Sequence, residues 1–155
     1  MMRGSWMIVM LCAWTMMSAL NGTVGQSLAA IGEPDVKIVM THRMFKVTKG
    51  GGEIGQPMFR LEAGKYTTIT LENRDKVAHE FVSPLFRMTE VHVGGEATMI
   101  WTDRAAGVRV EPGKSVELKF WVPRFINTFE PFWCNVHGKE HGSMMRGEVV
   151  VAGTR

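Results

Sequence analysis

Short segments in which polar and apolar residues alternate recur along the chain from about residue 35 onward. Residues 66–73 (YTTITLEN) and 115–122 (SVELKFWV) alternate clearly and are rich in β-branched or aromatic side chains. A period of two is typical of a strand that buries one face in a core. Similar reasoning predicts further strands at residues 36–40, 58–65, 78–82, 99–102, 132–134 and 147–151.

Glycine and proline separate these segments. Residues 49–57 (KGGGEIGQP) predict a flexible loop, and Glu-Pro-Gly-Lys at 111–114 predicts a turn. No amphipathic helix of a dozen residues is legible, and the less regular section around residues 92–95 leaves a short helix or an insertion open. Seven to eight short strands with frequent turns predict an all-β fold, a Greek-key β-sandwich or barrel.

The N-terminus has a different pattern. Arg3 precedes an apolar run at residues 6–14, and small and polar residues follow. This order predicts a signal peptide at residues 1–27, with the cleavage position left open. The apolar run is too short to span a membrane, which takes about 20 residues. We therefore expect a periplasmic or secreted protein with no membrane span after removal of the leader, and a single domain over residues 28–155.

Length and charge narrow the function classes. A chain of 155 residues suits one domain, and its formal net charge of +3 comes from Lys and Arg scattered among Asp and Glu. Without a basic cluster, nothing indicates nucleic-acid binding. No Ser-His-Asp triad or catalytic pair of carboxylates is legible. We expect a protein that is not an enzyme, unless the candidate site described below leaves a position open to a small molecule.

The cysteine count changes once the leader is removed. Cys12 lies in the leader, so Cys134 is the one cysteine of the mature chain. One cysteine cannot form an internal disulfide, and a free thiol in an oxidising compartment calls for a reason. A buried, inert thiol is the plain alternative.

A second feature supplies that reason: soft ligands gather around Cys134. In FWCNVHGKEHGSMM (132–145), His137 follows at Cys-x2-His spacing and Met145 stands just before the last predicted strand. A remote imidazole, His79, lies in NRDKVAHEFVSP (73–84). Two imidazoles, one thiolate and a weak axial thioether form the ligand set of electron-transfer copper sites. These residues predict a copper site.

Over residues 36–151 the chain resembles the cupredoxins, the single-domain blue-copper fold. The matching pieces are Asn73 with VAHEFV (77–82), PGKS (112–115), and Cys134-x2-His137 followed by Met145-x-Gly147. The resemblance implies one copper ion cycling between Cu(I) and Cu(II), with His79, Cys134 and His137 in its plane and Met145 as axial candidate. It also implies a monomer that exchanges single electrons with a redox partner such as a c-type cytochrome or a copper enzyme.

Three departures from the family pattern leave alternatives open. Ten residues separate Cys134 from Met145, a longer loop than the common arrangement, so His141 and Met144 are alternative fourth ligands. Glu80 stands where several members have Asn. His141 and Glu80 make a red-copper (nitrosocyanin-like) variant with an open coordination position conceivable, although neighbouring residues on a strand point to opposite faces. A periplasmic copper carrier or delivery protein is the main functional alternative.

Overall fold

The computed structural model describes residues 33–52, 55–124, 128–138 and 143–153. The predicted signal peptide (1–27) and His141 lie outside these residues. Within them, no helix is both long and apolar enough to cross a membrane.

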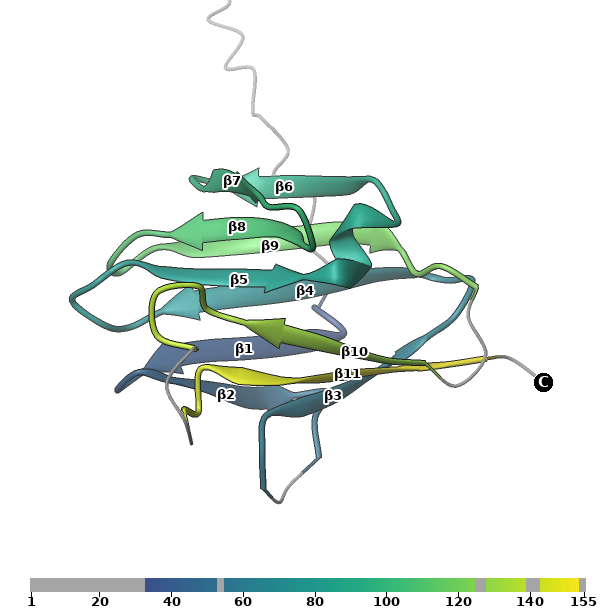
Figure 1. Ribbon diagram of the computed structural model, residues 1–155, viewed down its shortest axis with the longest axis horizontal. Helices are drawn as coiled ribbons and strands as arrows, with labels where there is room; N and C mark the ends of the chain where they lie inside the picture. The colour runs from purple at the N-terminus through teal and green to yellow at the C-terminus, as the bar shows by residue number, and fades with distance from the viewer. Residues whose placement is uncertain (1–32, 53–54, 125–127, 139–142, 154–155) are drawn as a thin grey trace, which may run out of the picture. The chain divides into compact units, whose positions relative to one another are not determined.

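The described residues form two packed β-sheets and one short 3-10 helix, η1 (Pro84–Arg87) (Figure 1). The all-β sandwich is therefore confirmed. The five-stranded sheet has the order β2 (Met44–Lys49), β1 (Val36–Thr41), β4 (Tyr66–Asn73), β9 (Ser115–Trp121), β6 (Val91–Gly95). The six-stranded sheet has the order β3 (Met58–Glu62), β11 (Arg146–Ala152), β10 (Thr128–Trp133), β5 (His79–Ser83), β8 (Ala106–Val110), β7 (Thr98–Trp101).

The described residues form eleven strands, more than the seven to eight predicted, and three of them, β2, β6 and β8, were missed. Residues 108–110, which belong to β8, were expected only to lead into the turn at 111–114. β6 replaces the predicted irregular section around residues 92–95 and pairs antiparallel with β9. None of its side chains is fully buried, so no apolar face marks it in the sequence. In β2 only Phe45 is fully buried. Strands at a sheet edge bury less surface, and their alternation is correspondingly weak.

The core lies between the two sheets. β4 buries every second side chain and β9 does the same, as the alternation predicted. From the other sheet, Phe81 and Phe132 face each other with ring centroids 5.0 Å apart, and Phe45 of the first sheet approaches both. These aromatic contacts fix the spacing between the sheets beside the predicted ligands.

β5 and β10 carry the predicted ligands to one end of their sheet. The two strands are antiparallel neighbours, with Trp133 opposite Val82. Because they run in opposite directions, the start of β5 and the end of β10 meet at the same end. His79 begins β5 and Cys134 follows β10 directly. In Figure 1 the β1–β2 turn and the β4–β5 connection lie at this end as well.

Candidate metal site

Three of the predicted ligands come together. One potential ligand atom from each of His79, Cys134 and His137 lies within 4.8 Å of the others. The Cys134 Sγ is 3.8 Å from Nδ1 of His137, and the two imidazole rings lie with centroids 5.0 Å apart. His79 and Cys134 are fully buried, whereas His137 is partly exposed. The cluster is thus internal, with one imidazole reaching toward the surface.

The ring of His79 has two different environments. Its Nε2 lies 2.8 Å from Oδ2 of Asp75, while its buried Nδ1 has no hydrogen-bond partner among the described residues. A buried polar atom left without a partner costs about 1–3 kcal/mol. A metal ion between His79, Cys134 and His137 would satisfy this atom, so the donor set fits a bound metal.

The surroundings favour charge on both groups of the buried pair. Burial by itself would raise the pKa of Cys134, but the imidazole of His79 and the backbone N–H of Glu80 lower it below its ordinary value. Burial likewise would lower the pKa of His79, but Cys134 and Asp75 raise it overall. The Glu80 N–H lies 3.4 Å from Sγ. The lowered pKa of Cys134 makes its thiolate, the form in which cysteine binds a metal, easier to reach.

Asp75 is itself held as an anion. Burial would raise its pKa, but the backbone N–H groups of Arg43 and His42 and the imidazole of His79 lower it below the ordinary range. Asn73, part of the resemblance, accepts a hydrogen bond from the Asp75 N–H and donates to the carbonyls of Val77 and Val110. The β4–β5 connection is thereby fixed on either side of Asp75.

The segment after Cys134 returns to it at Met145. The Cys134 N–H donates to the Met145 carbonyl at 2.9 Å, and the Ser143 hydroxyl bridges the His137 carbonyl and the Met145 N–H. Met145 is fully buried, while Met144 is 38% exposed. These contacts place the backbone of Met145 next to the cluster. His141, the alternative ligand, is not among the described residues.

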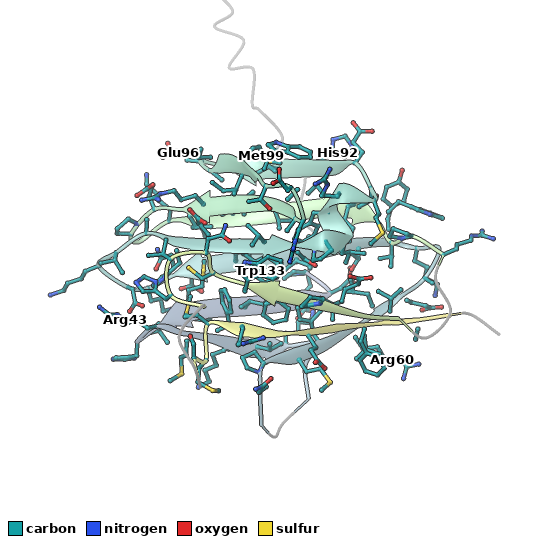
Figure 2. All side chains as sticks on the ribbon, viewed as in Figure 1. Arg43, Arg60, His92, Glu96, Met99 and Trp133 are labelled. Atoms are coloured by element: carbon teal, nitrogen blue, oxygen red, sulfur yellow. The ribbon has the colours of Figure 1, made fainter. Side chains whose placement is uncertain are left out.

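Glu80 is engaged away from the ligand cluster. Its carboxylate accepts a hydrogen bond of 2.8 Å from the side-chain amide of Asn135 and lies 3.7 Å from the guanidinium of Arg109. The Asn135 carbonyl oxygen in turn accepts from the indole N–H of Trp133. Figure 2 labels Trp133 on β10. Glu80 thus serves as a structural partner, as the opposite-face argument for neighbouring strand residues predicts.

Sequence reasoning missed two residues that support the cluster, Asp75 and Asn135. Asp75 precedes His79 by four positions in a polar connection, and Asn135 directly follows Cys134. Neither belongs to a periodic pattern. A general expectation that a metal-binding histidine has a carboxylate partner was the one signal pointing toward Asp75.

Comparison with known proteins gives a limited result. No protein-family model matches the chain, and no curated protein sequence matches it. Among solved structures, the chain is similar to the reduced Cu(I) form of an amicyanin variant at pH 4. The two share 16% sequence identity with a TM-score of 0.46, and the match covers 79% of this chain and 87% of the other. The oxidized state of another amicyanin variant gives 14% identity, the same TM-score and the same coverage. We therefore infer the metal below from the residues of this chain.

Proposed function

We propose that this protein binds one copper ion through His79, Cys134 and His137, with Met145 as axial ligand, and transfers single electrons between redox partners. The observation that carries the proposal is a buried thiol beside two imidazoles, one of which has a buried nitrogen without a hydrogen-bond partner among the described residues. Thiolate and imidazole together select copper over hard cations such as Mg²⁺ or Ca²⁺.

The chain holds these ligands in a stiff frame. His79 begins a strand that is hydrogen-bonded to β8 and β10, and the backbone N–H of Cys134 is bonded to Met145. Bound copper would supply a one-electron Cu(I)/Cu(II) couple. Because the ligands are held by two strands and by the backbone hydrogen bond between Cys134 and Met145, a change of metal charge would require little movement of the chain. This suits electron transfer.

His137 is the member of the cluster through which a partner can approach. His137 is partly exposed and Val136 beside it is 52% exposed, whereas His79 and Cys134 are fully buried. We infer that a redox partner, such as a c-type cytochrome or a copper enzyme, docks on this side. With the leader predicted at residues 1–27, we place the protein in the periplasm or outside the cell, as a monomer.

Copper delivery is the second candidate function. The exposed thioether of Met144 stands next to the buried Met145, and thioethers are soft ligands suited to Cu(I). A delivery protein releases its metal to an apo-partner, whereas an electron carrier keeps it through repeated cycles. Reversible voltammetry at a stable potential therefore supports electron transfer. Loss of copper to an apo-partner without reversible cycling supports delivery.

A red-copper site has less support. The Glu80 carboxylate, which that variant would bring to the metal, already bonds Asn135 and lies near Arg109. An open coordination position would make the visible spectrum sensitive to added azide. We expect no change in the spectrum on adding azide.

The central test is a Cu(II) titration of the purified protein. We expect an intense thiolate-to-copper band in the visible region, which disappears in Cys134→Ser and is lost or strongly shifted in His137→Gln. His92→Gln, which changes an exposed histidine of β6, is the matched control and should keep the band. Absence of the band in the wild-type protein would overturn the proposal.

A further inference from the structure

The carboxylate of Asp75 is the meeting point of three hydrogen bonds. Its Oδ2 lies 2.8 Å from Nε2 of His79 and accepts a hydrogen bond from the backbone N–H of Arg43 at 3.1 Å. Its Oδ1 accepts a hydrogen bond from the backbone N–H of His42 at 2.8 Å. The Asp75 side chain is 17% exposed and His79 is fully buried. A nearly enclosed anion therefore stands directly behind the buried imidazole of the cluster.

This contact determines which nitrogen of His79 carries the hydrogen. An ionised carboxylate can only accept, so the hydrogen between Asp75 and His79 belongs to Nε2. In the neutral ring, Nδ1 then has a free lone pair. That nitrogen is the buried one without a hydrogen-bond partner in the described part of the chain. Asp75 thus leaves the ligand nitrogen in the form that binds a metal.

The β1–β2 turn is shaped to hold this anion. His42 and Arg43 both have positive φ, 50° and 54°, a left-handed conformation that L-residues other than glycine adopt at a cost. In this conformation both of their N–H groups point at Asp75, which lies 33 positions after His42 and 32 positions after Arg43. Figure 2 labels Arg43 at this end of the sheets. Besides His79, two backbone N–H groups of the described residues hold the carboxylate.

We propose that Asp75 is a positioning residue for the metal site: it fixes the tautomer and orientation of His79, and its charge lowers the reduction potential of the bound copper. The part that concerns the potential rests on the proposed copper function, and the part that concerns the tautomer does not. A carboxylate behind a ligating histidine raises the basicity of the ligand. Its negative charge favours the more positive ion, Cu(II), over Cu(I).

The first experiment needs no copper. Long-range ¹H–¹⁵N NMR of the metal-free protein, at a pH where the imidazole is neutral, reports which nitrogen of His79 is protonated. We expect hydrogen on Nε2 in the wild type, and a shift toward Nδ1 in Asp75→Leu, which removes the acceptor. Hydrogen on Nδ1 in the wild type overturns the proposal. Because this result needs neither a variant nor the metal, it stands apart from the test of copper binding.

The second experiment is voltammetry of the copper-loaded protein. Asp75→Asn keeps the size of the side chain and an acceptor oxygen but removes the charge. We expect a roughly tenfold loss in the preference for Cu(II) over Cu(I), which is an upward shift of about 59 mV for a one-electron couple. The tautomer should stay unchanged in this variant, so the shift reports charge and not a lost orientation.

Asp35 provides the matched control. It too accepts a backbone N–H, from Thr68 at 2.8 Å, and it lies just before β1, at the opposite end of that strand from the His42 turn. Asp35→Asn therefore removes the same charge far from the cluster and should leave the potential unchanged. An unchanged potential in folded Asp75→Asn, or equal shifts in the two variants, overturns the role of the Asp75 charge.

Discussion

The side-chain amide of Asn135 donates a 2.8 Å hydrogen bond to the carboxylate of Glu80. Asn135 directly follows Cys134, and Glu80 directly follows His79, so this contact joins the two segments that carry the predicted ligands. The amide donor stands on the Cys134 segment, and the carboxylate acceptor stands on β5.

The first prediction concerns this tie. Glu80→Ala removes the carboxylate that accepts from the Asn135 amide and lies near the Arg109 guanidinium, and Glu80 is 8% exposed in the folded chain. We expect a loss of about 1.5–3 kcal/mol in the free energy of unfolding, the usual contribution of a hydrogen bond to a charged group. Urea denaturation of the metal-free protein measures it. Glu111→Ala, which removes an exposed partner of Arg109, should cost less than about 0.5 kcal/mol. Equal losses would contradict a special role for Glu80.

The second prediction concerns the fourth ligand. Met145→Leu keeps the volume of a fully buried side chain, so we expect a cost below about 1.5 kcal/mol in the free energy of unfolding. Loss of the thioether should raise the reduction potential and change the visible and electron paramagnetic resonance spectra of the copper form. Met144→Leu and His141→Ala should leave the spectra as they are. A changed spectrum in His141→Ala, with none in Met145→Leu, would make His141 the fourth ligand.

The third prediction concerns the close packing of Gly138. A Cβ at this position would lie 2.6 Å from the carbonyl oxygens of both Cys134 and Met145. We expect Gly138→Ala to lower the free energy of unfolding by about 1–3 kcal/mol, as overpacking does, and to shift the visible band because Cys134 must move. Thermal denaturation and absorption spectra of the variant check both effects. Gly52→Ala, where a Cβ meets none of the described residues within 4 Å, should change neither.

The fourth prediction concerns the pH dependence of stability. Burial raises the pKa of Glu130 in β10 above its ordinary value. The folded chain therefore holds this proton more tightly than the unfolded chain. Both forms are protonated at a pH well below the ordinary value, and there Glu130 has no effect on stability. As the pH rises through the unfolded and then the folded pKa, the folded state loses stability.

Glu130→Gln tests this sign. We expect the variant to have a higher melting temperature than the wild type at pH 7 and the same melting temperature near pH 3. A difference that grows toward acid pH would contradict the direction of the shift. Glu72→Gln provides the opposite case, because hydrogen bonds to Arg74 and Lys37 lower the pKa of Glu72. Removing that charge should reduce stability at pH 7 and have less effect as the pH falls through the pKa of Glu72.

The strands with the clearest signal in the sequence are those with one fully buried face. β4 and β9 bury every second residue, and their alternation was legible. β2 and β6 bury few side chains, so nothing in their sequences separates them from a loop. Their formation depends on the neighbours with which they pair, β1 and β9.

The same distinction applies to the site. The residue types of His79, Cys134 and His137 indicated metal chemistry, and the structure brings them together. The supporting contacts were not predictable, because they join distant segments by loop geometry. Asp75 accepts a hydrogen bond from the N–H of His42, which lies 33 positions away in the sequence. Glu80 accepts one from the side chain of Asn135, which lies 55 positions away. Neither contact follows a local rule of spacing.

The neighbouring placement of β5 and β10 has a consequence for the order of folding. Glu80 and Cys134 are 54 positions apart, so His79 reaches Cys134 only after a long-range pairing has formed. Such non-local contacts form late and slowly. A partly folded chain could bind a metal through Cys134 and His137 alone. The folded β-sandwich would add His79 as a third ligand. A metal that binds only the folded state would increase the free energy of unfolding. The increase is about 2.7 kcal/mol when the free metal concentration is a hundred times the dissociation constant.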